Sequence, residues 1–171
     1  MNVVIRDLEQ GDVDALQQLL ESLPDYAERA TGSPPGPSEA LSVLIEAPDG
    51  FDPACKRAIG LWNGDRLVAF ADVLMGYPNA ETAFIGLLAV AGDCHRTGLG
   101  RLIHQSVVER ARGECNADGN LRLAILDTNK DVAEPFWRSL GYAPTGESVP
   151  YQRGTVASTV ALWERPIDPG A

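Results

Sequence analysis

The chain has 171 residues, which is enough for one domain with a sizeable hydrophobic core. Its 44% of hydrophobic and 22% of charged residues are ordinary for a soluble globular protein. The net charge of −10 and isoelectric point of about 4.6 argue against a nucleic acid partner, because phosphate backbones are bound by basic surfaces. No apolar run approaches the roughly 20 residues that cross a bilayer, and the first residues lack the pattern of a signal peptide. We therefore expect a cytoplasmic protein with no membrane partner.

The spacing of cysteine and histidine gives no sign of a metal site. Cys55, Cys94 and Cys115 are far apart, and His95 and His104 do not complete a zinc-binding pattern with them. We expect free thiols and no bound metal.

The N-terminal part of the sequence predicts a strand followed by two helices. β-Branched residues at positions 3–5 predict a short strand. Apolar residues at helical spacing follow, namely Val13, Leu16, Leu20 and Leu23. We expect Pro24 to end this helix. The segment Thr31–Ser38, rich in proline and glycine, predicts an exposed loop. A second helix then follows, whose inner face is predicted to carry Leu41, Leu44 and Ile45.

From residue 58 onward the pattern changes to strands. Ala58–Trp62 and Arg66–Met75 are joined by Asn63-Gly64-Asp65, which is a strong signal for a hairpin. Gly76–Ala80 predicts a second turn. The almost wholly apolar segment Thr82–Val90 predicts a strand that is buried on both faces.

The stretch Phe84–Arg112 carries the strongest functional signal. It predicts the end of the buried strand, a loop containing Gly98 and Gly100, and an amphipathic helix. Gly86 inside the strand indicates a β-bulge or the close approach of a ligand. The start of a helix presents free N–H groups, and glycine lets the backbone approach a ligand closely, so this loop is a candidate anion site. The inner stripe of the helix is predicted to be Leu99, Leu102, Ile103, Val107 and Ala111. We place His104 on the helix surface.

The C-terminal part predicts two strands around a short helix. Leu121–Leu126 is apolar, Val132–Leu140 is helical with Gly141 as its terminating residue, and Thr155–Trp163 predicts the last strand. Another strand is expected just before that last one. We expect one domain over residues 1–165 and a frayed C-terminal tail over 166–171.

Three kinds of anion loop compete for the sequence HRTGLG at residues 95–100. A P-loop needs GxxxxGK followed by Ser or Thr, and no such run is present. A dinucleotide fingerprint needs a third glycine where Ile103 stands. The third kind is the pyrophosphate loop of acyl-CoA-dependent N-acyltransferases, in which amides of a loop and a helix start bind the pyrophosphate.

Two segments carry a resemblance to one such family. LAVAGDCHRTGLGR, at Leu88–Arg101, resembles the strand, loop and helix that contain the motif Q/R-x-x-G-x-G/A. NKDVAEPFWRSLGY, at Asn129–Tyr142, resembles the segment Asn-x-x-x-Ala, an aromatic residue and Gly-Phe/Tyr. Both motifs are typical of the GNAT family (Gcn5-related N-acetyltransferases), and the order of predicted elements resembles that family over nearly the whole chain.

The resemblance implies an α/β fold, the GNAT acyl-CoA N-acyltransferase fold: a mixed twisted sheet, flanked by helices, whose fourth and fifth strands splay apart. It also implies acetyl-CoA as cosubstrate, with its pantetheine arm between those two strands. The residues that it assigns to cofactor binding are Leu88, Ala89, Val90, His95, Arg96, Thr97, Gly98, Leu99, Gly100, Arg101, Asn129, Ala133, Phe136 and Trp137.

Three positions depart from the family pattern. His95 stands where the family usually has Gln or Arg; its ring can donate a hydrogen bond, or it can simply point to water. Trp137 stands where many members have a Tyr that protonates the departing thiolate, which an indole cannot do. Phe84 stands where some members have a basic Glu, and Phe cannot accept a proton.

The catalytic groups are therefore sought elsewhere. An amine acceptor is protonated at pH 7 and must lose a proton before it attacks. The candidate bases are Asp72, Glu81 and Asp127, and each is alternatively a solvated carboxylate. Tyr151 is a candidate acid, as are Tyr77 and Tyr142, and each is alternatively a packing residue.

The function that the resemblance implies is N-acetyl transfer from acetyl-CoA to a primary amine of a small molecule, by direct attack in a ternary complex. The alternatives are a non-catalytic acyl-CoA-binding sensor and an acetyltransferase that acts on protein N-termini or lysines. The acceptor site is expected among the loops Pro24–Ser38, Gly76–Ala80 and Ala143–Gly154. The resemblance also allows a homodimer, since related proteins often dimerise.

Overall fold

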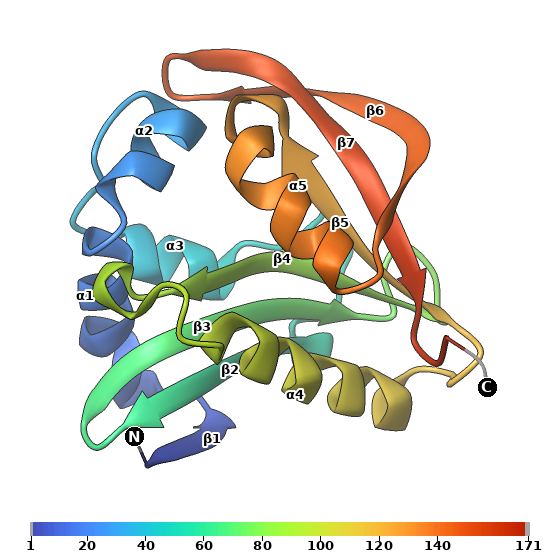
Figure 1. The fold of residues 1–171 in the computed structure, drawn as a ribbon, viewed down its shortest axis with the longest axis horizontal. Helices are drawn as coiled ribbons and strands as arrows, with labels where there is room; N and C mark the ends of the chain where they lie inside the picture. The colour runs from blue at the N-terminus through green and yellow to red at the C-terminus, as the bar shows by residue number, and fades with distance from the viewer. Residues whose placement is uncertain (1, 170–171) are drawn as a thin grey trace.

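The computed structural model describes residues 2–169, which form one seven-stranded sheet with helices on both faces (Figure 1). The strands lie in the order β1-β2-β3-β4-β5-β7-β6. Their bounds are β1 (Val3–Asp7), β2 (Lys56–Asn63), β3 (Arg66–Met75), β4 (Thr82–Val90), β5 (Asn120–Leu126), β6 (Ala143–Arg153) and β7 (Val156–Pro166). The α-helices are α1 (Val13–Glu21), α2 (Pro24–Thr31), α3 (Glu39–Ile45), α4 (Leu99–Glu114) and α5 (Lys130–Ser139).

The N-terminal half of the sheet is an antiparallel meander, β1 to β4. The predicted hairpin is confirmed, with β2 and β3 joined at Gly64, whose φ of 61° is the left-handed conformation that glycine adopts without strain. The strand predicted at Thr82–Val90 is confirmed with the same bounds as β4. Gly86 is the extra residue of a β-bulge, because Asp72 pairs with Leu87 whereas the next residue, Val73, pairs with Ile85.

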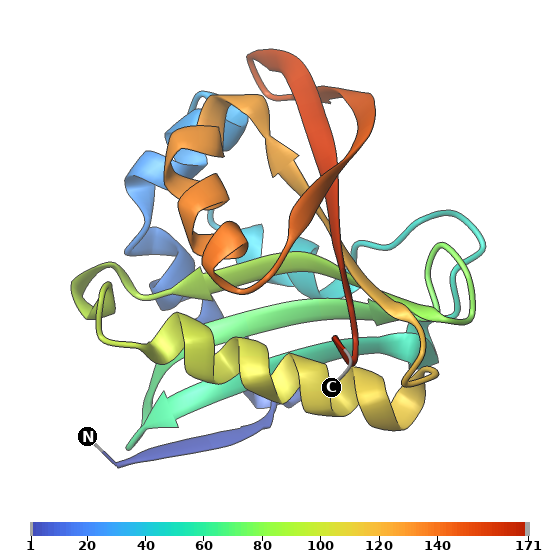
Figure 2. The same ribbon diagram turned by 45° about the vertical axis from the view of Figure 1, so that its right-hand side comes forward.

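The C-terminal half of the sheet diverges from the N-terminal half. β5 runs parallel to β4 and then pairs with β7, which in turn pairs with β6. The free ends of β4 and β5 point away from each other in both views (Figures 1 and 2). The structure therefore confirms the predicted mixed sheet with splayed fourth and fifth strands.

Helices cover the two faces of the meander. α4 packs on β2, β3 and β4 from one face, while α1 packs on β3 and against α3 on the other (Figure 1). The core between these layers is aliphatic and aromatic, and its fully buried side chains include Leu16, Phe70 and Ile103. Among residues 2–169, none of the helices has the length and apolarity required for crossing a membrane.

The region between α1 and β2 corrects two predictions. α1 ends at Glu21, before Pro24, as predicted, but the loop expected over Pro24–Ser38 begins with a helix: Pro24 occupies the first turn of α2, where its missing N–H costs nothing. The helix predicted around residues 41–45 is α3, but Leu41 is 49% exposed and Ile45 is 70% exposed, so they do not form its inner face. Ala40 is the buried residue of this helix.

The C-terminal tail is also more ordered than predicted. Pro166 still belongs to β7, and Ile167 is fully buried with its N–H bound to the carbonyl of Gly119. Asp168 forms an ion pair with Arg112 of α4. Fraying is therefore the wrong description for residues 166–168, and the prediction for 170–171 lies outside the described residues.

Candidate functional site

The site is centred on the gap between β4 and β5. The two strands pair only from Thr82 and Asn120 to Ile85 and Leu123. Beyond that point β4 remains paired with β3 as far as Val90, and β5 remains paired with β7 as far as Leu126. Each strand is thus held on its outer side while the sides that face each other lose their hydrogen-bonding partner.

The open edge of β4 presents backbone groups at every second residue. The N–H of Ala91 donates to Val68 on β3, so Ala91, Ala89 and Leu87 direct their backbone groups toward β3. Leu88 and Val90 alternate with them and direct their N–H and C=O groups into the gap. Two residues of the predicted cofactor set therefore offer an extended ligand a strand edge. Ala89, also in that set, has its backbone turned away and its side chain buried.

The loop after β4 is shaped to expose amides. Arg96 and Gly98 have φ values of 62° and 86°, which is the left-handed region, and Arg96 is the only residue other than glycine with positive φ among residues 2–169. The first hydrogen bond of α4 runs from the N–H of Leu102 to the carbonyl of Gly98. The amides of Leu99, Gly100 and Arg101 come before it and have no acceptor within the helix. This end of α4 therefore has the unpaired backbone amides that anion sites at helix starts use.

Side chains hold this loop in place. Ser22 Oγ accepts a hydrogen bond from the N–H of Gly92 at 3.1 Å, and Thr97 Oγ1 donates to the carbonyl of Cys94 at 2.5 Å. His95 Nε2 lies 2.9 Å from the carbonyl oxygen of Val90. Since a carbonyl only accepts, the ring donates this bond, which ties the loop to the last residue of β4.

The second motif lies directly beside this loop. A Cβ at Gly100 would come within 3.1 Å of the Phe136 ring, so glycine allows α5 to pack closely on the start of α4. Trp137 is buried, and its ring lies edge-on to Phe136 with centroids 5.0 Å apart. Ala133 is half-buried on the same helix. The fold thus brings the two sequence motifs together at one end of the gap.

Asn129 has a partner that the sequence did not reveal. Its Oδ1 accepts a hydrogen bond of 2.7 Å from Nε of Arg29, on α2. Thr128 Oγ1 donates to the backbone carbonyl of the same arginine at 2.7 Å. α2 is therefore bound to the end of β5, and a helix that was predicted as a loop forms part of the wall of the site.

The prediction for His104 is wrong. The side chain is buried, at 3% exposure, and its Nε2 lies 2.9 Å from the hydroxyl of Tyr142. Burial, with repulsion from the guanidinium groups of Arg165 and Arg101, lowers the pKa of His104 to about 4. The ring is neutral at pH 7 and packs edge-on to Trp137, which joins α4 to α5.

Asp72 is the candidate base that lies at the gap. It sits on β3 beside the bulge, and its Oδ2 would be 2.8 Å from a Cβ on Gly86. Leu74 lies opposite Phe84 on β4, and residues that pair across two strands have side chains on the same face of the sheet. Residues two apart in one strand, such as Asp72 and Leu74, also share a face. Asp72 therefore projects from the same face as Phe84. This face therefore has a carboxylate although Phe84 of β4 provides none, because Asp72 of the neighbouring strand β3 provides it.

The surroundings of Asp72 favour proton acceptance. Its side chain is 10% exposed, and Nζ of Lys56 lies 2.7 Å from its Oδ1. Burial raises the pKa of Asp72 above its ordinary value, while Lys56 opposes this rise. The result is a carboxylate that is a stronger base than one in water.

The other predicted catalytic residues lie away from this point. Glu81 is exposed in the turn before β4, and Asp127 is exposed beside Lys130, with which it forms an ion pair. Tyr151 donates its hydroxyl proton to the carbonyl of Ala30 at 2.7 Å. Of the three carboxylates, the structure brings only Asp72 to the bulge.

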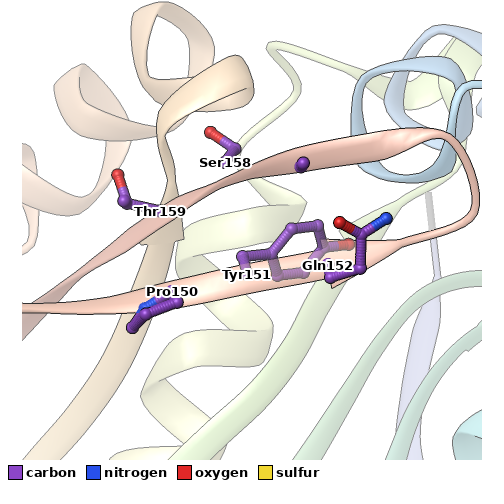
Figure 3. A pocket seen from close by; sticks show the side chains of 6 residues that line it. Pro150, Tyr151, Gln152, Ser158 and Thr159 are labelled. Carbon is purple, nitrogen blue, oxygen red and sulfur yellow. The ribbon is translucent and has the colours of Figure 1, made fainter.

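A shallow, open depression of about 500 Å³ lies on the β6–β7 hairpin (Figure 3). It is lined by Pro150, Tyr151, Gln152, Ala157, Ser158 and Thr159. These residues come from the hairpin alone, so the depression lies outside the gap. Residues 2–169 contain no group of three or more His, Cys, Asp or Glu side chains placed to share a metal ion.

The comparisons with known proteins agree with this geometry. The chain resembles the ribosomal-protein-S18-alanine N-acetyltransferase of Escherichia coli, with 19% identity, a TM-score of 0.68, and coverage of 99% of this chain and 97% of that chain. An acetyltransferase of Thermus thermophilus is 21% identical, with a TM-score of 0.70, and the match covers 97% of this chain and 97% of that chain. A GCN5-related N-acetyltransferase of Kribbella flavida is 23% identical, with a TM-score of 0.67, and the match covers 96% of this chain and 97% of that chain. No curated protein sequence matches the chain.

The family comparison covers both motifs and most of the sheet. The model of the acetyltransferase (GNAT) family matches residues 16–142, which extend from α1 to the start of β6. The matched range contains the splayed strands, the loop with its left-handed residues, and α5. The chain therefore belongs to the GNAT acetyltransferase family.

Proposed function

We propose that the protein is an N-acetyltransferase that moves the acetyl group of acetyl-CoA to a primary amine of a small molecule. One observation carries the proposal: the open edge of β4 runs from a loop of exposed amides at one end to the carboxylate of Asp72 at the other. This edge joins a site for the anionic end of a ligand to a site for proton transfer.

The residues present fit acetyl-CoA. The pyrophosphate needs several N–H donors, and the amides from Arg96 to Arg101 supply them at the start of α4. The pantetheine arm carries amide groups, which suit the free C=O of Leu88 and the free N–H of Val90, since the carbonyl of Val90 is already bound to His95. Phe136 and Trp137 of α5 supply an apolar wall beside them.

The chemistry then divides between two groups of this chain. When bound, acetyl-CoA supplies a thioester whose carbonyl carbon receives the amine nitrogen as the C–S bond breaks, and CoA leaves as a thiolate that takes its proton from solvent. The N–H of Leu88, which faces the gap, donates to the carbonyl oxygen as negative charge develops there. Asp72 accepts the proton that the amine loses, directly or through one water molecule. The amine approaches from the face of the sheet that carries α3, because Asp72 projects from that face.

A second candidate is a sensor that binds acyl-CoA without turnover. It is favoured by the state of two tyrosines, since the hydroxyl of Tyr151 is bound to Ala30 and that of Tyr142 lies against His104. Trp137 offers no proton to a thiolate at neutral pH. A sensor would bind the ligand and release no free thiol.

The test combines binding with turnover. Acetyl-CoA should raise the melting temperature in proportion to the logarithm of its concentration, whereas ADP should raise it less. Thiol release should then be followed with a panel of polyamines, amino acids, aminoglycosides and peptides with a free N-terminus. Turnover that falls about 100-fold in Asp72→Asn, with the affinity for acetyl-CoA unchanged, supports the enzyme. Binding without turnover supports the sensor, and no thermal shift at millimolar acetyl-CoA refutes both.

A further inference from the structure

The pair formed by Lys56 and Asp72 is unusual for its burial. The side chains are 8% and 10% exposed, and the Nζ to Oδ1 distance is 2.7 Å. Lys56 is one of only two lysines in the chain, and the other, Lys130, is 50% exposed in a local pair with Asp127. A buried ion pair stabilises a fold little, because desolvation offsets the attraction, and apolar replacements are often as stable. Its place in the molecule therefore needs another explanation.

Lys56 is itself anchored by the backbone. Its Nζ donates a hydrogen bond of 2.8 Å to the carbonyl of Glu46, the residue that follows α3. The same ammonium group contacts Oδ1 of Asp72, so the lysine links the end of α3 to β3. An ammonium group fixed at both sides holds the carboxylate in one rotation about its Cβ–Cγ bond.

That rotation decides which oxygen faces the site. Oδ1 lies against Lys56 and is shielded from solvent. Oδ2 lies over Gly86, where the absence of a side chain leaves it room. Gly86 is exposed and begins the part of β4 that is unpaired with β5. The oxygen that Lys56 leaves free is thus the one at the gap.

Lys56 also sets the charge of the carboxylate. Burial raises the pKa of Asp72, Lys56 on β2 lowers it, and Glu46 at the end of α3 raises it. The Glu46 carboxylate is in turn paired with Arg153 of β6. Gly86, the neighbour on β4, brings no charge. Lys56 is therefore the group whose charge favours the ionised form of Asp72.

We propose that Lys56 is a positioning residue for the acetyl transfer: it turns Oδ2 of Asp72 toward the bulge and places a positive charge against the other carboxylate oxygen. The proposal rests on the proposed function of Asp72 as base. Lys56 does not contact the substrate and acts only through this carboxylate.

The experiment compares Lys56→Met with Lys56→Arg and with the control Lys130→Met. The carboxyl ¹³C resonance of Asp72, assigned by its loss in Asp72→Asn, is titrated in the ligand-free protein. In Lys56→Met the titration should move upward by about one pH unit or more, and the acidic limb of kcat/KM should move with it. Activity should then fall about tenfold or more on the acidic limb and recover once the pH lies above the shifted limb, with the KM for acetyl-CoA unchanged. Lys56→Arg and Lys130→Met should titrate as the wild type does.

The outcomes separate this proposal from the one on which it rests. A resonance that titrates in Lys56→Met as in the wild type overturns the role of Lys56, as does a loss of activity by one constant factor at every pH. A resonance that moves as expected while Asp72→Asn remains fully active supports the hold of Lys56 on Asp72 and overturns Asp72 as the base. If Lys56→Met does not fold, Lys56→Gln, which keeps a donor but removes the charge, gives the same titration test.

Discussion

The buried His104 makes the stability of the protein dependent on pH. Burial lowers the pKa of this histidine to about 4, against 6.5 for an exposed one. Between these values the unfolded chain binds a proton that the folded protein does not, so the free energy of unfolding falls as the pH falls. One pKa unit corresponds to about 1.4 kcal/mol, so the contribution lost is about 1.4 kcal/mol at pH 5.5 and about 2.5 kcal/mol at pH 4.5.

The assay is urea unfolding of the wild type and of His104→Gln at pH 7.5, 6.5, 5.5 and 4.5, at constant ionic strength. At pH 7.5 the variant should be less stable by about 2 kcal/mol, because it loses packing against Trp137 and Tyr142. Since glutamine does not titrate, this difference should shrink below pH 6.5 and vanish or reverse near pH 4.5. The control Tyr142→Phe keeps the histidine and should follow the wild-type pH dependence. A difference between His104→Gln and the wild type that stays constant with pH refutes the reasoning.

Three further predictions test the loop, the bulge and the C-terminal segment. Gly98→Val forces a β-branched residue into a φ of 86° and should weaken acetyl-CoA binding about tenfold or more, as measured by calorimetry. The control Gly113→Ala, on the open side of the same helix, should leave this affinity unchanged. Gly86→Ala brings a Cβ within 2.8 Å of Oδ2 of Asp72 and should lower kcat about tenfold in the thiol-release assay; an unchanged kcat would remove that oxygen from the reaction. Ile167→Ala empties a fully buried position and should cost about 2–4 kcal/mol in urea unfolding, whereas a frayed end would cost nothing.

The parts of the fold that the sequence predicted are those with local signals. The turn at Gly64 and the strand Thr82–Val90 are marked by residues that lie within or beside them, and the structure places both as expected. The bulge at Gly86 was also readable, because glycine inside an apolar strand needs a reason. The contact between the loop at residues 95–100 and Asn129–Tyr142 was predicted from the family resemblance, because local sequence patterns give no information on long-range contacts.

The parts that the sequence missed depend on distant partners. The first helix ends before Pro24, as predicted, but Pro24 also begins a second helix, α2, which the local pattern did not indicate. His104 is buried because α5 and Tyr142 cover the flank of α4, and that tyrosine lies 38 residues away in the chain. The bond from Arg29 to Asn129 joins residues 100 positions apart, and no periodicity marks either of them.

The same reasoning explains why the acid–base chemistry was hard to place. A search for the catalytic base that is confined to β4 finds Phe84, which cannot accept a proton. Such a search would conclude that the protein binds its ligand without catalysis. The bulge changes this, because a glycine at the inserted position leaves an empty volume on the face that Phe84 shares. The carboxylate of Asp72, one strand away, occupies that volume, and Lys56 of the next strand holds its other oxygen. Three neighbouring strands thus meet at one point: β2 contributes the ammonium group of Lys56, β3 the carboxylate of Asp72, and β4 the glycine that leaves room for it. Only the register between the strands shows that these three residues lie together.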